Sequence, residues 1–594
     1  MRSILIRLRP RHAIAGVALL TVAVSVSGQS RPYRTLNDRF PPPPEFTRDQ
    51  WARRAAYLRE HVLVSAGLLP MPERAPLRSE IFGTITHTHY SVSKVYFESI
   101  PGFYVTGNLY RPAGQGPFPA ILSPHGHWAY GRLENTPLNS GPGRAIGLAR
   151  QGFVVFSHDM IGYNDSRQLP HTFDGRRARL WGLSLAGLQL WNSIRALDFL
   201  ESLPDVRRDA IGVTGESGGG TQTFLLAAVD PRVAVAAPVN MISLHMQGGC
   251  LCENPPGLRL ETTNVEIAAA FAPRPLLMIS ATGDWTKETM EVEYPAVQRI
   301  YRLFGAEDRV HAVRVDAEHN YNRESRETMY AWMARWLKDA PPETRIAERS
   351  FTPDPLQDLL VFHGRPLPPG ALTPDQLTER WIQDATAQLA GSPAGFAVTL
   401  RHVLGFAGDA ISDTRDGMQR TTPARGRDVV LVASTGTTLP TALTRAGFDV
   451  RPVSWTLFEA EGAAGIRHFQ TYNLTAAAQR VADIAAAIRA NPGAPLVADG
   501  TAALAALLAA AVAHPPLAVL DLGRFDRSND DAFLEHLEIP GLRRAGDLQT
   551  AASMTRGRLV LHNAGDRSGL KGPEIHSEPL GPNQIAGILR KLSR

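Results

Sequence analysis

The chain has 594 residues, of which 44% are hydrophobic and 20% charged, an ordinary composition for a globular protein. A chain of this length buries more than one hydrophobic core, so we expect about two to four domains. The formal net charge is +5, but four arginines in the first 28 residues leave only +1 for the remainder. The charge therefore gives no reason to expect nucleic-acid binding.

The first 28 residues have the pattern of a signal peptide. Four arginines precede an apolar run over residues 13–26, which ends before the small residues Ser27 and Gly28. The run is shorter than the stretch of about 20 residues that a transmembrane helix needs, which favours a cleaved signal over an uncleaved anchor. We therefore predict export to the periplasm or the cell exterior, with no membrane association after cleavage.

The segment that follows predicts an arm and then antiparallel strands. Residues 41–44 are four prolines, and residues 50–69 have a helical pattern, so we expect residues 29–80 to pack on the first domain. Residues 84–111 alternate β-branched and aromatic residues around Gly102, which predicts antiparallel strands.

From residue 119 onward, short apolar runs alternate with helical stretches. The apolar runs occupy residues 120–122, 153–156, 210–213, 233–236 and 276–279. Runs of this kind are buried on both faces, so they predict a mostly parallel, doubly wound sheet with helices on both sides. This domain closes with a helix over residues 324–337.

The second half repeats the alternation of strands and helices. We divide the chain into a catalytic domain over residues 81–340, a linker over 341–365, and a second α/β domain over 366–594. A helix, a strand and a helix over 476–489, 495–498 and 502–513 repeat the arrangement around Ser217, but the turn there, Asp499-Gly500-Thr501, has no serine. The second domain is either a degenerate copy of the first or another α/β domain, and in both cases we predict that it is non-catalytic.

The motif with the clearest chemistry is Gly-Glu-Ser-Gly-Gly at residues 215–219. It follows the predicted strand over 210–213 and precedes a helical stretch over 221–228. This is the setting of a nucleophile elbow, in which a sharp turn exposes the serine and glycines let the backbone close. We therefore predict that Ser217 is a catalytic nucleophile.

A serine hydroxyl needs a base to accept its proton and a carboxylate to orient that base. After such an elbow, the acid and the histidine follow in that order along the chain. Asp284 follows the strand over 276–279, and His319 follows the strand over 310–315. His311 begins that strand and is the weaker base. The rival acids Asp316 and Glu318 adjoin His319 in the chain and suit the role of neighbours better than that of the orienting group.

The predicted oxyanion hole needs two N–H donors. We expect the backbone of Gly218 to provide one, and the backbone of His127, in the loop after the strand over 120–122, to provide the other. An alternative makes His125 and His127 metal ligands, but the sequence shows no third ligand, so we predict no metal. Asp159 ends another strand and is expected to brace the site.

Several tryptophans have two open interpretations, because they could line an acyl or sugar pocket or belong to the core. They are Trp128, Trp181, Trp191 and Trp285.

The chain has only two cysteines, Cys250 and Cys252. With one residue between them they exclude a disulfide framework that spans loops. Buried free thiols, a strained bridge and an intermolecular link remain open. A metal site would need partners that this pair does not supply.

The segment over 123–128, the elbow at 215–219, Gly283-Asp284 and His319 together resemble bacterial α/β-hydrolases of the acetyl xylan esterase and dienelactone hydrolase-like group. The resemblance covers residues 80–340. It implies an α/β-hydrolase fold and hydrolysis of a carboxylic ester through an acyl-enzyme, without a metal or an organic cofactor. Large exported members often carry a second domain.

We therefore predict a serine esterase that acts on a small-molecule or carbohydrate ester, with acetyl as the acyl group. A serine peptidase uses the same triad and is the enzymatic alternative. The other alternative is a glycan-binding protein with a vestigial hydrolase domain, against which the intact set of Ser217, Asp284 and His319 argues.

Overall fold

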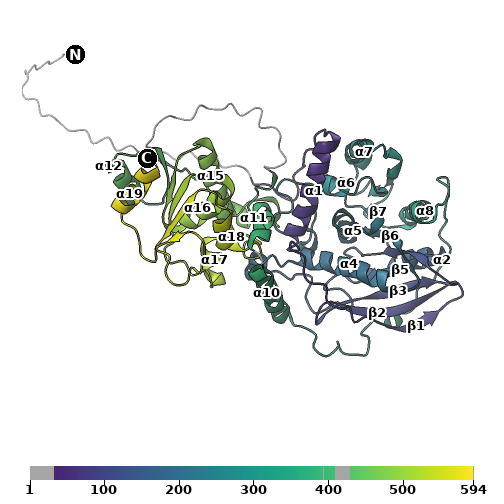
Figure 1. The fold of residues 1–594 in the computed structure, drawn as a ribbon. Coiled ribbons are helices and arrows are strands. Elements are labelled where there is room, and N and C mark those ends of the chain that lie inside the picture. Colours follow the sequence, from purple (N-terminus) through teal and green to yellow (C-terminus); the bar gives the residue numbers. More distant parts are fainter. Residues whose placement is uncertain (1–32, 392, 409–428, 593–594) are drawn as a thin grey trace, which may run out of the picture.

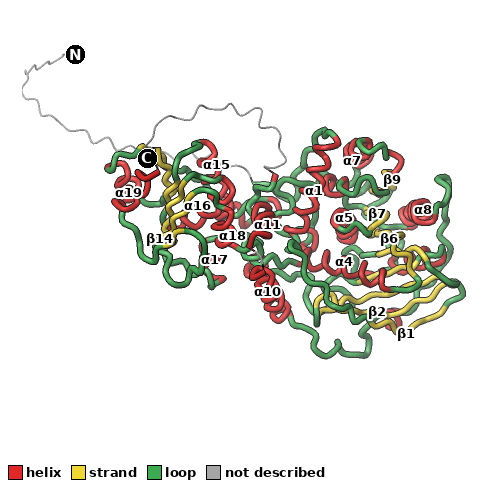
Figure 2. Tube along the Cα trace, in the orientation of Figure 1, coloured by secondary structure: helices red, strands yellow, loops and turns green. Residues whose placement is uncertain are grey.

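The computed structural model describes residues 33–391, 393–408 and 429–592, so the predicted signal peptide lies outside the described residues. The described chain forms two α/β lobes that lie side by side (Figure 1), each with a sheet among helices (Figure 2). Among the described residues, no helix has both the length and the apolar character that crossing a bilayer requires.

The first lobe contains a nine-stranded sheet in the order β1-β2-β3-β5-β4-β6-β7-β8-β9. The strands are β1 (Glu80–Thr86), β2 (Tyr90–Ile100), β3 (Phe103–Pro112), β4 (Phe118–Leu122), β5 (Val154–His158), β6 (Val206–Glu216), β7 (Val233–Val239), β8 (Leu276–Ala281) and β9 (Val310–Val315). Neighbouring strands are antiparallel from β1 to β5 and parallel from β5 to β9. The predicted change from antiparallel to parallel strands is confirmed.

The strands that were predicted from short apolar runs are buried in the structure. Every residue of β5 and of β8 is buried, whereas β1, at the edge of the sheet, is mostly exposed. Helices of this lobe are α1 (Arg48–Ser65), α2 (Gly141–Arg150), α3 (Arg176–Leu180), α4 (Leu185–Ser202), α5 (Gly218–Val229), α6 (Asn264–Ala269), α7 (Tyr294–Arg302) and α8 (Arg323–Lys338). Helices α2 and α8 pack on one face of the sheet, and α4 and α5 pack on the other.

The predicted arm packs on the first lobe. Helix α1 starts with a capping box between Thr47 and Gln50 and buries Trp51 and Leu58 in the main core. It ends four residues before the predicted end. The reason is Gly67, which has a φ of +70° and whose Cβ, if it had one, would lie 1.9 Å from the carbonyl oxygen of Gly182.

The second lobe contains a parallel six-stranded sheet in the order β11-β10-β12-β13-β14-β15. Its strands are β10 (Val429–Ala433), β11 (Asp449–Pro452), β12 (Leu496–Ala498), β13 (Leu517–Asp521), β14 (Arg558–His562) and β15 (Glu574–Ile575). Its helices are α12 (Thr438–Arg445), α13 (Ala460–Ala464), α14 (Phe469–Tyr472), α15 (Ala476–Ala490), α16 (Gly500–Ala513), α17 (Asp530–His536), α18 (Asp547–Met554) and α19 (Pro582–Leu592). Helices α15, α16 and α18 cover one face, and α12 and α19 cover the other.

The two sheets share one topology. The parallel part of the first sheet has the spatial order β5-β4-β6-β7-β8-β9, and the second sheet has the order β11-β10-β12-β13-β14-β15. In both, the second strand along the chain lies at the edge, the first lies next to it, and the third to sixth follow in sequence. Asp499 caps α16 after β12, the third strand of its sheet, just as Ser217 caps α5 after β6. The shared order agrees with a degenerate copy, and it also occurs among doubly wound folds in general, so both interpretations of the second domain stand.

Two helices connect the lobes after the short helix α9 (Leu356–Leu359): α10 (Pro374–Gly391) and α11 (Ala397–Val403). Leu377, Trp381 and Ala385 of α10 are buried in the main core of the first lobe. The indole N–H of Trp381 donates to the carbonyl oxygen of Trp181 at 3.0 Å. Helix α10 therefore packs as part of the first lobe, although residues 374–391 fall within the predicted second domain over 366–594.

We expect Trp381→Ala to lower the free energy of unfolding by about 3–5 kcal/mol, because it leaves a cavity in that core. Denaturant unfolding followed by circular dichroism measures the change. Leu457→Ala is the control, since Leu457 is 60% exposed and its removal should change stability by less than about 0.5 kcal/mol. Equal stability of the two variants would contradict this role for α10.

Candidate active site

Ser217 lies at the sharp turn between β6 and α5. Its φ of +55° and ψ of −121° are sparsely populated for a residue with a side chain, and such a conformation costs about 1–3 kcal/mol. Its backbone N–H donates to the carbonyl oxygen of Val239 at 3.0 Å, which ties the turn to the end of β7. The predicted strand-turn-helix setting is confirmed.

The glycines around Ser217 allow a close approach to the loop after β4. A Cβ on Gly215 would lie 2.4 Å from the carbonyl oxygen of Pro124, and one on Gly219 would lie 2.5 Å from the same atom. Either side chain would clash with the backbone, so the loop over 123–128 can lie against the elbow only where these residues are glycine.

Asp284 and His319 are in direct contact. Nδ1 of His319 donates to Oδ2 of Asp284 at 2.8 Å. The other oxygen, Oδ1, accepts from the backbone N–H of Thr286 at 2.7 Å and from its hydroxyl at 2.5 Å. The Asp284 side chain is only 2% exposed, whereas that of His319 is 26% exposed. A buried carboxylate thus fixes the ring orientation of a histidine that reaches the surface.

Backbone contacts hold these two residues on the same edge of the sheet as Ser217. The N–H of Gly283 donates to the carbonyl oxygen of Ala317 at 2.9 Å, and a Cβ on Gly283 would lie 2.9 Å from Cα of Glu318. The side-chain amide of Asn240, the residue after β7, donates to the carbonyl oxygen of Asn320 at 2.8 Å. The end of β7 therefore contacts both the serine turn and the histidine loop.

Nε2 of His319 is buried and, among the described residues, has no hydrogen-bond partner. The Ser217 hydroxyl therefore makes no hydrogen bond to it here, and such bonds often tighten only when substrate is bound. The Trp285 ring lies against the His319 ring, with centroids 4.6 Å apart, and in the described part of the chain its indole N–H also lacks a partner. Both nitrogens are therefore buried without a hydrogen-bond partner in the described part of the chain.

Glu216, the residue before the serine, organises the neighbouring loop. Its Oε1 accepts from the N–H of Gly126 at 3.0 Å and from the indole N–H of Trp128 at 2.9 Å. Its Oε2 pairs with Arg144 of α2 at 2.8 Å, and neither of these two side chains is exposed. The N–H of Gly126 thus points at Glu216 and away from the serine.

His127 lies against the turn itself. A Cβ on Gly218 would lie 2.6 Å from Cε1 of His127, so the imidazole packs on the glycine that follows Ser217. His125 has a different environment, because its Nε2 accepts from the N–H of Met160 at 2.9 Å and its Nδ1 donates to the carbonyl oxygen of Gly126 at 2.7 Å. Burial lowers the pKa of His125 well below its ordinary value, so the ring is neutral with both nitrogens occupied.

The other residues that the sequence singled out have different environments in the structure. Asp159 is buried and pairs with Arg132 at 2.5 Å, as expected of a bracing residue. Asp316 is exposed and accepts from the Thr282 hydroxyl, while His319 pairs with Asp284. Trp191 and Trp181 belong to the main core, where their indole N–H groups donate to the Ser99 carbonyl and to Asp530. Trp128 and Trp285 are the two of the four that lie beside the site.

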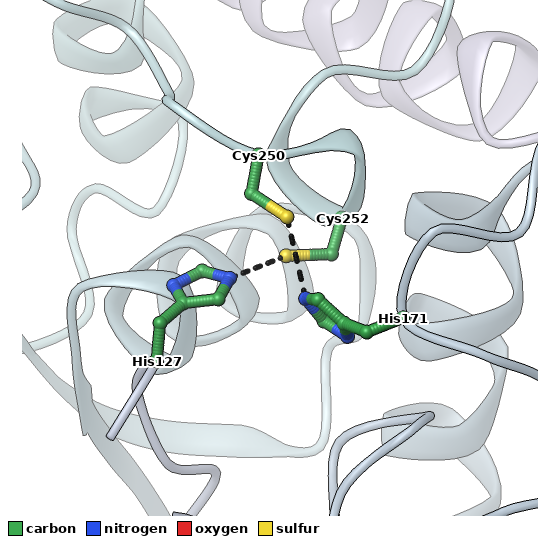
Figure 3. Close-up of side chains that lie close together, drawn as sticks. All are labelled: His127, His171, Cys250 and Cys252. Carbon is green, nitrogen blue, oxygen red and sulfur yellow. Dashed lines mark hydrogen bonds between the residues drawn. The ribbon is translucent and has the colours of Figure 1, made fainter. Parts of the chain in front are cut away.

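The two cysteines are unpaired and lie beside two histidines, as Figure 3 shows. Nε2 of His127 lies 3.1 Å from Sγ of Cys252, and Nε2 of His171 lies 3.3 Å from Sγ of Cys250. Contact with the Cys252 thiol, together with the neighbouring imidazoles of His127 and His171, lowers the pKa of the Cys250 thiol, although burial opposes the shift. Sequence reasoning did not single out His171, which belongs to no recognisable motif and is 79 residues from Cys250.

No protein-family model matches the chain. The solved structure of Methylesterase BT1017 is 30% identical in sequence, with a TM-score of 0.50, and the match covers 58% of this chain and 78% of that one. "Putative hydrolase YtaP" of Bacillus subtilis (strain 168) is 26% identical over 239 residues, which is 38% of this chain and 80% of that protein. Acyl-coenzyme A thioesterase 3 of Mus musculus is 30% identical over 136 residues, 23% of this chain and 26% of that protein.

We expect Glu216→Ala to destabilise the first lobe by about 3–5 kcal/mol, because the change leaves Arg144 buried without its charge partner. Denaturant unfolding measures the loss. The control is Glu307→Ala, which removes a carboxylate from an exposed ion pair with Arg302 and should cost about 0–1 kcal/mol. If the two variants lose the same stability, Glu216 does not have this organising role.

Proposed function

Because the chain belongs to the α/β-hydrolase family of esterases, we propose that it hydrolyses carboxylic esters by a serine mechanism. In this proposal Ser217 is the nucleophile, His319 the general base, and Asp284 the group that orients His319. The observation that carries the proposal is the 2.8 Å contact between Asp284 and His319 on the edge of the sheet where the strained Ser217 lies.

The first half of the reaction forms an acyl-enzyme. Nε2 of His319 accepts the hydroxyl proton while Oγ of Ser217 attacks the ester carbonyl carbon, which gives a tetrahedral intermediate. The intermediate collapses, the bond to the alcohol oxygen breaks, and His319 returns the proton to the departing alcohol. Asp284 stabilises the imidazolium that exists between these two transfers.

The second half releases the acid. Water loses a proton to His319 as it attacks the acyl carbon, and collapse of the second tetrahedral intermediate gives the carboxylic acid and the free Ser217 hydroxyl. The negative charge on the carbonyl oxygen develops in both halves. In our proposal the backbone N–H groups of Gly218 and His127 stabilise it. The engagement of the Gly126 N–H by Glu216 supports His127 as the donor from that loop.

The proposed substrate is an acetylated carbohydrate. His319 protonates the leaving alcohol, so the groups beside His319 contact the alcohol side of the ester. The Trp285 ring lies there, and an aromatic face suits packing against a sugar alcohol.

A second candidate substrate is the methyl ester of a sugar acid. The 30% identity to Methylesterase BT1017 supports it. The two candidates place the sugar on opposite sides of the ester bond, because a methyl ester has a small alcohol and a large acyl group. Comparison of the two products therefore distinguishes them.

We expect Ser217→Ala to lower kcat for p-nitrophenyl acetate by at least about 10⁴-fold, since the covalent step is lost. Release of p-nitrophenol measures the rate. Ser202→Ala is the matched control, because its hydroxyl donates only to the Phe199 carbonyl at the far end of α4, and it should retain full activity. Equal turnover by Ser217→Ala and the unmodified enzyme would exclude the proposed nucleophile, and absence of turnover by the unmodified enzyme on all short acyl esters would exclude the esterase.

We also expect a higher kcat/KM for acetylated oligosaccharides than for methyl-esterified oligosaccharides of sugar acids. Acetate and methanol release, measured on the same enzyme preparation, give the two values. A higher value for methanol release would favour the second candidate. Faster cleavage of a peptide than of either ester would support the peptidase instead.

A further inference from the structure

Four side chains from three separate segments converge beside the elbow. His127 belongs to the loop after β4, and His171 belongs to the loop after β5. The two cysteines belong to the segment after β7, where Cys250 precedes the short 3-10 turn Leu251–Glu253 and Cys252 lies within it. Figure 3 shows the two sulfurs and the two imidazoles pointing toward one another. One nitrogen from each histidine and both sulfurs all lie within 4.8 Å of one another.

We propose that these four residues bind one Zn²⁺ ion. With bonds of about 2.3 Å to sulfur and about 2.0 Å to nitrogen, a tetrahedral zinc site has ligand atoms about 3.3–3.8 Å apart. The observed nitrogen-to-sulfur separations of 3.1 and 3.3 Å are close to those edges. The remaining separations between ligand atoms reach at most 4.8 Å. Side-chain rotations that move these atoms by at most about one ångström therefore complete the tetrahedron.

The His171 ring is already oriented as a ligand. Its Nδ1 donates to the carbonyl oxygen of Ile161 at 2.6 Å. Nδ1 therefore carries the proton, and the lone pair of Nε2 points toward Sγ of Cys250. A histidine that ligates a metal commonly donates its second N–H to a backbone carbonyl in this way, which fixes the tautomer and the ring.

The cysteine turn is held in place independently of a metal. Oε2 of Glu253 accepts from the backbone N–H groups of Gly249 and Cys250 at 2.7 and 2.9 Å. Glu253 is only 3% exposed and Cys252 is not exposed at all. The two thiols are therefore presented from a defined backbone.

The donor set favours zinc over harder cations. Thiolate and imidazole donors suit Zn²⁺, whereas Mg²⁺ and Ca²⁺ prefer oxygen ligands. Two thiolates balance the charge of the ion, so the complex, in which Cys252 is buried and the other three ligands are partly buried, is neutral. Four protein ligands fill the tetrahedron and leave no position for a reacting water, which is the arrangement of a structural site.

The ion would join the three loops that surround the elbow. His127 packs on Gly218, so a metal bound to its Nε2 would hold the loop over 123–128 against the serine turn. The effect on catalysis rests on the proposed function, since it assigns His127 to the oxyanion hole. The binding of zinc does not rest on it, and Ser217→Ala should bind zinc as well as the unmodified chain.

The test is the zinc content of the full chain, purified without a polyhistidine tag and measured by elemental mass spectrometry. We expect one zinc per chain for the unmodified protein and for Ser217→Ala, and at least a tenfold loss in Cys250→Ser/Cys252→Ser and in His171→Ala. His245→Ala is the control, because His245 is a half-buried histidine that belongs to the loop after β7 and lies outside the cluster, and it should retain the metal.

Zinc-edge X-ray absorption on the unmodified protein provides a readout that does not depend on whether a variant folds. We expect two sulfur ligands at about 2.3 Å and two nitrogen ligands at about 2.0 Å. The proposal fails if the reduced protein, supplied with Zn²⁺, binds less than one tenth of an equivalent. It also fails if the bound ion shows only oxygen and nitrogen ligands, if another metal occupies the cluster in preference to zinc, or if peptide mass analysis finds Cys250 and Cys252 joined in a disulfide as purified.

Discussion

The active-site edge of the first lobe depends on one buried carboxylate. Glu216 has no exposed surface, and a buried charge is expensive unless donors surround it. The guanidinium of Arg144, the backbone N–H of Gly126 and the indole of Trp128 supply those donors. Because Glu216 adjoins Ser217 in the chain, the same contacts that stabilise the charge also hold the loop after β4 on the serine turn. The contacts that stabilise the buried Glu216 charge are therefore also the contacts that position the loop beside Ser217.

Parallel strands bring the remaining groups to the same edge. Each of the six parallel strands is followed by a loop that contributes to this edge. The residues are His127 after β4, His171 after β5, Ser217 after β6, the two cysteines after β7, Asp284 after β8 and His319 after β9. The second lobe has the same strand order, but where the first lobe has its serine it has Asp499, which caps α16. The chemistry of the first lobe thus arises from the residues in its loops, since the order of the parallel strands is common to both lobes.

Local patterns allowed much of this to be predicted. The apolar strands and the glycine-flanked Ser217 can be read within short windows. The order of acid and histidine that follows such an elbow then singles out Asp284 and His319, which the structure places in contact. The cluster of His171 with the cysteines could not be read in that way, because its members come from three loops without regular spacing. The early end of α1 escaped prediction for a similar reason, since Gly67 contacts Gly182, 115 positions further along the chain.

Covalent labelling shows whether Ser217 carries the acyl group, as we propose. A fluorophosphonate ester reacts with an activated serine and leaves a stable adduct in place of the acyl group. After reaction and tryptic digestion, the peptide over residues 209–232 contains Ser217. We expect one adduct per chain, located on Ser217, and loss of esterase activity in proportion to labelling. An adduct on a different residue that abolishes the activity, or full activity with Ser217 labelled, would contradict the proposal.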